Sequence, residues 1–361
     1  MLDLERDQKV RNYLQQQGID QMLVSDPLAV FYLTGKWIFP GERFMGLILK
    51  EEGTPTLIVN ALSRFPEEIG VKKVYYNDGD DINVLLKNEI NEKKVLGVDK
   101  NLPARFLLPM GDAHVAEGFR NGSFAIDDAR AIKDEAERQK MRVASLVNDK
   151  AMAEFKKLIR PGVSEEEAAA QCLGIYKSLG ASRYSFSPIV AFGKNAADPH
   201  HGPDDTVLKE GDTVLFDVGC VVDDYCSDMT RVFYYKREPD VLTRKIYDLV
   251  RRANEEAEAM LKPGIPIASI DKKARDIITE GGYGKDFTHR LGHFIGIETH
   301  DFGDVSQANP NYTKPGNTFS IEPGIYNVES GIGVRIEDLV LITEDGAEVL
   351  NHYTHDWEVI D

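Results

Sequence analysis

Helix-like and strand-like patterns of apolar residues alternate along the first third of the chain. Residues 4–17 carry apolar side chains at helical spacing and stop at Gly18, and the apolar run at 20–25 predicts a short buried strand. The pattern then continues with a hairpin at 44–49 and 56–59 around Glu51-Glu52-Gly53, strands at 71–76 and 94–98, and helices at 82–90 and 106–110. This alternation predicts a small α/β domain.

The character of the chain changes at residue 127. Residues 127–142 are densely charged and helical in pattern, and we place a domain boundary just before them. The predicted organisation is an N-terminal domain over 1–126 and a second domain over 127–361. The alternative is a solvated helix inside one large domain.

The second domain contains a weak internal repeat. Residues 158–163, with Pro161-Gly162, match residues 261–265, and residues 209–219 match residues 314–324. Each copy places a Pro-Gly turn between two helices and then a Lys-x-Gly turn before an apolar strand. The two strands end at Asp217 and Glu322. Two copies are too few for a solenoid, so we expect one domain built from two related halves, with a site where the acid-bearing strands meet.

Composition and charge narrow the class of protein. The chain has 361 residues, 43 Lys plus Arg and 60 Asp plus Glu, which gives a net charge of −17. An acidic surface disfavours nucleic acid and anionic membranes as partners. No apolar run approaches the ~20 residues of a membrane span, and the first residues lack an apolar secretory core. With three cysteines, this predicts a soluble cytoplasmic protein.

Four acidic residues stand inside or at the ends of apolar strands. Asp217 and Asp228 flank ten residues, enough for strand, turn and strand, and Glu322 and Glu337 interrupt apolar runs in the second half. Carboxylates placed together repel each other unless a cation lies between them. Turn capping by the aspartates and an ion pair of Glu337 with Arg335 are the ordinary alternatives.

The histidines favour the metal site. Three of the eight lie in residues 289–300 (His289, His293 and His300), and His200 and His201 form a pair upstream of Asp217. Carboxylates and imidazoles suit Mn²⁺, Co²⁺, Zn²⁺ or Fe²⁺. Four acids exceed the needs of one open zinc site and suit two metals with bridging carboxylates.

These residues, in this order, resemble the ligand set of the pita-bread metallopeptidases. That family includes Xaa-Pro dipeptidase (prolidase), aminopeptidase P and methionine aminopeptidase. The resemblance implies an α/β (α+β) chain, with a creatinase-like α/β domain before a pita-bread domain of two related halves. It also implies the ligand set, which is Asp217, Asp228, His293, Glu322 and Glu337.

The resemblance further implies roles for single residues. Asp217 would bind one ion, His293 and Glu322 the other, and Asp228 and Glu337 would bridge them around a nucleophilic hydroxide. Glu322 would move the proton of the water. The substrate-facing residues implied by the family are the following: His200, His289, His300 and Arg335.

The same resemblance implies hydrolysis of the Xaa-Pro bond of small peptides, two Mn²⁺ ions (with Co²⁺, Zn²⁺ or Fe²⁺ as alternatives) and a homodimer. A dipeptidase needs a positive group for the free carboxylate, and Arg43, in a loop like that of bacterial prolidases, is the candidate. Aminopeptidase P activity on longer peptides is the alternative. A non-catalytic or creatinase-like protein fits the intact ligand set less well. Phe294 stands where the family often has glycine, and we expect it to narrow the pocket wall. Thr299 also departs from the family pattern, and both residues bear on specificity.

Overall fold

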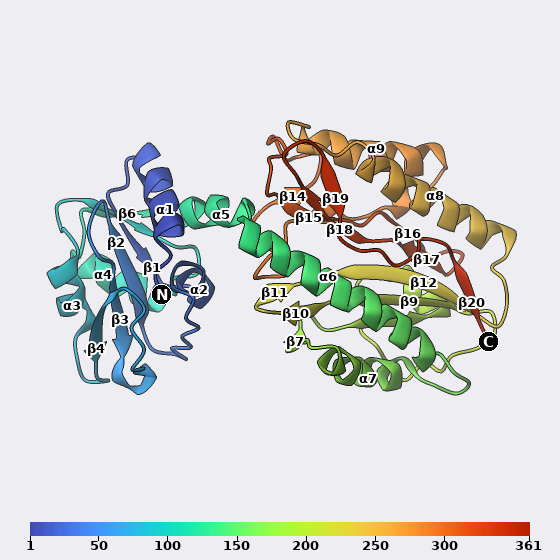
Figure 1. The fold of residues 1–361 in the computed structure, drawn as a ribbon, viewed down its shortest axis with the longest axis horizontal. Coiled ribbons are helices and arrows are strands. Elements are labelled where there is room, and N and C mark those ends of the chain that lie inside the picture. The colour runs from blue at the N-terminus through green and yellow to red at the C-terminus, as the bar shows by residue number, and fades with distance from the viewer. The chain divides into compact units, whose positions relative to one another are not determined.

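The computed structural model describes residues 1–361 and divides into two compact units, Met1–Arg130 and Ala131–Asp361 (Figure 1). None of its helices is both long and apolar enough to cross a membrane. Each unit has its own buried core.

The first unit is built on a six-stranded mixed sheet with the order β4-β3-β2-β1-β5-β6. Its strands and helices are α1 (Leu4–Gln16), β1 (Gln21–Val24), α2 (Pro27–Thr34), β2 (Met45–Lys50), β3 (Thr56–Asn60), β4 (Lys72–Tyr76), α3 (Ile82–Glu89), β5 (Val95–Val98), α4 (Ala104–Asp112), β6 (Gly118–Asn121) and α5 (Ser123–Ala131). The predicted hairpin is confirmed as the antiparallel pair β2–β3. Helix α2 escaped the pattern analysis because seven of its eight residues are buried, which leaves no polar face.

The prediction of one continuous charged helix over 127–142 is wrong, because the segment contains parts of two helices. Helix α5 ends at Ala131, and α6 (Glu135–Phe155) begins after three intervening residues, the last of which, Asp134, is its N-cap. The Asp134 side chain accepts a hydrogen bond from the backbone N–H of Glu137, and the Glu137 side chain accepts one from the backbone N–H of Asp134. This capping box starts a new helix inside a run whose composition is uniformly helical.

The second unit has four long helices around several small sheets. Its remaining elements are α7 (Glu165–Ser178), β7 (Arg183–Tyr184), β8 (Ile189–Phe192), β9 (Thr213–Val218), β10 (Cys220–Val222), β11 (Tyr225–Cys226), β12 (Met229–Tyr235), α8 (Val241–Glu258), α9 (Ile267–Glu280), β13 (Gly292–His293), β14 (Asp304–Val305), β15 (Thr318–Ile321), β16 (Gly324–Asn327), β17 (Ile332–Arg335), β18 (Asp338–Ile342), β19 (Ala347–Val349) and β20 (Glu358–Ile360). In Figure 1 the strands of this unit lie between α7 on one side and α8 and α9 on the other.

The internal repeat predicted from the sequence is present in the backbone. The Pro-Gly glycines Gly162 and Gly264 have φ of 78° and 81°, and the Lys-x-Gly glycines Gly211 and Gly316 have φ of 90° and 89°. These left-handed conformations favour glycine, so the two copies share turn geometry as well as sequence. The strands that follow, β9 and β15, each pair antiparallel with a later strand, β12 and β18 respectively.

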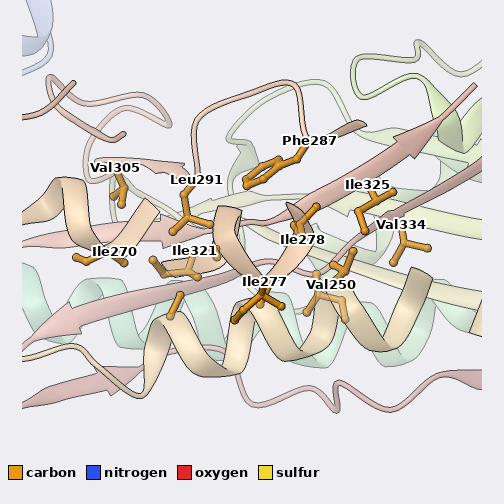
Figure 2. Packing of buried hydrophobic residues seen from close by; sticks show 14 of the residues in the cluster. Val250, Ile270, Ile277, Ile278, Phe287, Leu291, Val305, Ile321, Ile325 and Val334 are labelled. Atoms are coloured by element: carbon orange, nitrogen blue, oxygen red, sulfur yellow. The ribbon is translucent and has the colours of Figure 1, made fainter. Parts of the chain in front are cut away.

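The second half of this unit is held by an apolar core under α8 and α9. Figure 2 shows Val250 of α8 and Ile277 and Ile278 of α9 among the side chains that pack around Ile321 and Val334. All five residues are at most 3% exposed. Burial of these side chains fixes β15 and β17, the strands that lead into Glu322 and Glu337.

Candidate metal centre and catalytic pocket

The first pair of acidic residues comes from the strand pair β9–β12. Asp217 lies in β9 opposite Thr230 of β12, and Asp228 immediately precedes β12. Between them, β10 and β11 form a tight hairpin in which Asp223 and Asp224 take φ of 47° and 69°. Aspartate tolerates this left-handed region better than most residues, so the hairpin forms without a glycine at position 224.

The second half supplies the remaining ligand candidates. His293 lies in β13, Glu322 follows β15, and Glu337 lies between β17 and β18, where it forms a backbone bridge with Thr230. The His293 Nε2 atom is 3.5 Å from Asp228 Oδ2 and 3.6 Å from Glu322 Oε1. Donor atoms of Asp228, His293 and Glu337 lie within 4.8 Å of one another. The acids of the two halves therefore converge on one point.

Burial makes this cluster of carboxylates electrostatically unfavourable without a cation. Burial raises the pKa of Asp217, and burial together with the neighbouring carboxylates raises the pKa values of Asp228 and Glu337 well above their usual range. Arg335 opposes these shifts but does not cancel them. The cluster therefore has a deficit of positive charge.

Two carboxylate oxygens in the cluster also lack hydrogen-bond partners. Asp217 Oδ1 and Asp228 Oδ1 are both buried and accept no hydrogen bond from the protein. Buried carboxylate oxygens are normally hydrogen-bonded or bound to a metal. Hard oxygen donors together with one imidazole are the ligands that Mn²⁺, Co²⁺, Zn²⁺ and Fe²⁺ accept. The residues present therefore fit a centre of divalent ions.

A chain of hydrogen bonds fixes the carboxylates from the outer side. Arg335 donates to Asp217 at 2.5 Å, to Thr230 Oγ1 at 3.0 Å and to the Tyr326 hydroxyl at 2.7 Å. Thr230 in turn donates to Glu337 at 2.7 Å, and the Tyr326 hydroxyl lies 2.9 Å from His289 Nε2. Arg335 thus pairs with Asp217, whereas the sequence left a pair with Glu337 open. Such outer partners orient metal ligands.

Beside the carboxylates lies a cavity of about 210 Å³. Its lining residues are Phe186, Ile189, Pro199, His200, Asp217, Asp228, His289, Arg290, His293, Thr299, His300, Glu322, Arg335 and Glu337. Burial lowers the pKa of His289, and burial with the charge of nearby groups lowers the pKa of His300 to about 4. Both imidazoles are therefore neutral near pH 7 and can donate one N–H hydrogen bond each.

The structure brings nine of the ten predicted site residues to this cavity. The tenth, Arg43, lies in the first unit, where Asp78 binds its guanidinium through Nε at 2.7 Å and Nη2 at 2.9 Å. The expectation that Phe294 narrows the pocket wall is wrong. Its ring is 5% exposed and packs 5.5 Å from the ring of Phe319 in the core.

Sequence reasoning missed three polar residues of the site. Tyr326 and Thr230 sit in ordinary strand patterns, so no sequence signal separated them from core residues. Arg290 lines the cavity and lies between His289 and Leu291 in the segment that the histidine spacing had already marked. Its side chain is 41% exposed and lies 4.0 Å from Asp304, which leaves the guanidinium available to a ligand.

Comparisons with known proteins give matches over both units of the chain. Residues 139–344 match metallopeptidase family M24, and residues 6–132 match the creatinase/prolidase N-terminal domain. An uncharacterized peptidase of Staphylococcus saprophyticus is 37% identical, over 96% of this chain and 99% of the relative. A recombinant prolidase from Thermococcus sibiricus superposes with a TM-score of 0.91 at 32% identity, over 100% of both chains. An X-Pro aminopeptidase from Thermotoga maritima superposes with a TM-score of 0.86 at 28% identity, over 98% of this chain and 99% of the other.

Proposed function

Because the chain belongs to metallopeptidase family M24, we propose that it hydrolyses the bond between an N-terminal residue and proline in dipeptides. The observation that carries the proposal is the convergence of five candidate ligands and three histidines on one small cavity. The likeness to the Thermococcus prolidase supports the choice of substrate class. The likeness to the Thermotoga aminopeptidase makes cleavage of longer Xaa-Pro peptides the second candidate.

In this proposal Asp217, Asp228, His293, Glu322 and Glu337 hold two divalent ions, with Mn²⁺ as the expected metal. Bound there, the ions would polarise the scissile carbonyl and make an attacking water more acidic. Hard oxygen ligands with a single imidazole are compatible with Mn²⁺, and metal availability decides between it and Co²⁺, Zn²⁺ or Fe²⁺.

The chain's own residues then handle the protons and the developing charge. Glu322 is 16% exposed and reaches the cavity, so it would accept a proton from the attacking water and deliver it to the proline nitrogen. That nitrogen carries no hydrogen in the substrate and needs one to leave as an amine. His300 is neutral, and its N–H would stabilise the oxyanion that forms at the carbonyl. His200 and His289 would contact the substrate from the cavity wall.

Arg290 would bind the free carboxylate of a dipeptide. A dipeptidase must hold this charge close to the cut. Two arginines line the cavity: Arg335 is buried and paired with Asp217, whereas the side chain of Arg290 is partly exposed. Arg43 was the sequence candidate for this task, but Glu42 and Asp78 already neutralise it. We therefore propose Arg290 for this role. We also propose that the protein forms a homodimer and is located in the cytoplasm.

The specificity is tested by comparing Ala-Pro with Ala-Pro-Ala on the Mn²⁺-loaded protein. We expect the dipeptide to be cleaved at least about tenfold more efficiently, because the carboxylate of Ala-Pro-Ala lies one residue further from the cut and cannot make the same hydrogen bonds to Arg290. Arg290→Gln should raise KM for Ala-Pro about tenfold, the loss expected for a hydrogen bond to a charged group, and the matched Arg43→Gln should leave it unchanged. A preference for Ala-Pro-Ala would identify an aminopeptidase instead.

A further inference from the structure

A fully buried glutamate outside the cavity organises the loop that carries His200. Glu165 is the first residue of α7 and has an exposed fraction of 0%. Its carboxylate accepts from the backbone of Phe192 at 2.6 Å and from the amide of Asn195 at 3.0 Å through Oε1. Through Oε2 it accepts from the backbone of Asp204 at 3.1 Å and lies 2.6 Å from His201 Nε2. We assign the ring hydrogen of His201 to Nε2, since that atom faces a carboxylate oxygen.

All four donors belong to one segment, residues 192–204. The segment leaves β8 at Phe192, passes through His200 at the cavity and returns to α7 at Asp204. The backbone of Glu166 also donates to Asp204 at 3.1 Å, which closes the loop against the start of α7. Glu165 therefore bonds to both ends of the loop and, through His201, to its middle.

The position of His200 depends on the hydrogen bonds between Glu165 and the loop of residues 192–204. The two adjacent histidines differ in environment: His200 lines the cavity, and His201 is bonded to Glu165. The backbone N–H of His200 donates to Asp198 Oδ1 at 3.0 Å, and the residue lines the cavity, where its ring can contact a ligand. A shift of the loop would thus move the His200 ring directly.

The cluster of Glu165, His201 and Asp204 has the residue types of a metal site, and their donor atoms lie within 4.8 Å of one another. The contacts favour a different role. Each carboxylate oxygen of Glu165 already has two partners within hydrogen-bond distance in the protein. A carboxylate saturated by N–H donors is a structural acceptor, whereas the unpartnered oxygens of Asp217 and Asp228 mark the metal centre.

We propose that Glu165 and His201 are positioning residues that hold His200 in the productive geometry for the substrate. The proposal rests on the proposed function, in which His200 contacts the peptide. A misplacement of about 1 Å in such a residue can lower the rate about 100-fold. Loss of the four hydrogen bonds of Glu165 should therefore reduce the rate strongly, although Glu165 lies outside the cavity.

The test is a double-mutant cycle of Glu165→Gln with His200→Ala. Glu165→Gln keeps the volume and places an amide NH₂ against two donors. We expect each single variant to lose 10- to 100-fold in kcat/KM for Ala-Pro. In the His200→Ala background, Glu165→Gln should cost less than about twofold further. The matched control is Glu166→Gln, an exposed neighbour on the same turn, which should behave like the wild type.

His201 provides the conservative rescue. His201→Gln keeps a nitrogen donor toward Glu165 and should stay within about threefold of the wild type, and His201→Leu should lose about tenfold. Bound metal should remain unchanged in all these variants. A loss from Glu165→Gln that persists in the His200→Ala background, or a loss of metal, would overturn the proposal.

A second readout separates this proposal from the proposed function. In protein labelled at histidine ¹³Cε1, the His200 signal (assigned with His200→Ala) should shift in Glu165→Gln, and that of the exposed His352 should not. An unchanged His200 signal would overturn the positioning role even if Ala-Pro is cleaved. A shifted signal in a protein that cleaves neither peptide would support positioning and refute the dipeptidase.

Discussion

Glu337→Gln is expected to reduce Ala-Pro hydrolysis by more than about 100-fold and to lower the amount of metal bound. Outer partners of metal ligands already change metal affinity or activity 10- to 100-fold, and Glu337 is proposed to bind the metal directly. The substituted side chain keeps the volume and the acceptor for the Thr230 hydroxyl, but it loses the negative charge that the cations require. Metal content by elemental analysis and kcat/KM should therefore fall together.

The control for this substitution is Glu329→Gln. Glu329 lies in the turn between β16 and β17, and its side chain is 86% exposed, so neutralising it removes the same charge without touching the cluster. We expect wild-type activity and metal content. If Glu337→Gln retained near wild-type turnover with two metals bound, the assignment of the ligand set would be wrong.

Removal of metal is expected to destabilise the protein, and the loss should grow as the pH rises. In the metal-free folded protein, burial raises the pKa values of Asp217, Asp228 and Glu337 above those of the unfolded chain. The folded state then binds more protons than the unfolded state. The stabilisation that these groups contribute is therefore fully present below about pH 4, the pKa of the unfolded chain. That contribution is lost as the pH rises through the raised pKa values.

Metal binding displaces those protons, so the stabilisation by Mn²⁺ should increase between pH 5.5 and pH 8. At about 100 times its Kd a metal ion adds about 2.7 kcal/mol, which differential scanning calorimetry detects as a higher Tm. Asp228→Asn is the matched variant, since it removes one buried charge at nearly constant shape. Its metal-free form should be more stable than the metal-free wild type at pH 8. A Tm gain that shrinks with rising pH would contradict this view of the cluster.

The sequence predicted the acidic strands well because both physical signals for them are local. An acid inside an apolar run is costly to bury, and a repeated Lys-x-Gly turn marks where each run begins. The matching φ values of Gly211 and Gly316 show that the repeat reflects backbone geometry. From these signals alone, Asp217 and Glu322 could be placed at the meeting point of two halves.

Contacts between distant side chains could not be predicted in the same way. The partner of Arg335 is Asp217, 118 residues away, and the hydroxyl of Tyr326 joins the pair from a strand that looks like ordinary core. Phe294 was misplaced for a related reason. The family often has glycine at this position, which suggested that a larger side chain would narrow the pocket, but consecutive side chains of an extended backbone point to opposite faces, and Phe294 lies in the core.

Glu165 illustrates a further limit. In the sequence it is one of three consecutive glutamates at the start of a helix, a position where acidic residues are common because of the helix dipole. Glu167, two residues further on, forms a capping box with Ser164. Only the tertiary structure shows that Glu165 turns inward to the loop of His200.

We propose that the carboxylate–histidine cluster is a metal centre that hydrolyses Xaa-Pro bonds. The most direct measurement is Ala-Pro hydrolysis by metal-stripped protein titrated with Mn²⁺, with bound metal counted in the same samples. We expect no hydrolysis without metal and full activity when two ions are bound per chain. Bound metal without cleavage of either Ala-Pro or Ala-Pro-Ala would contradict it.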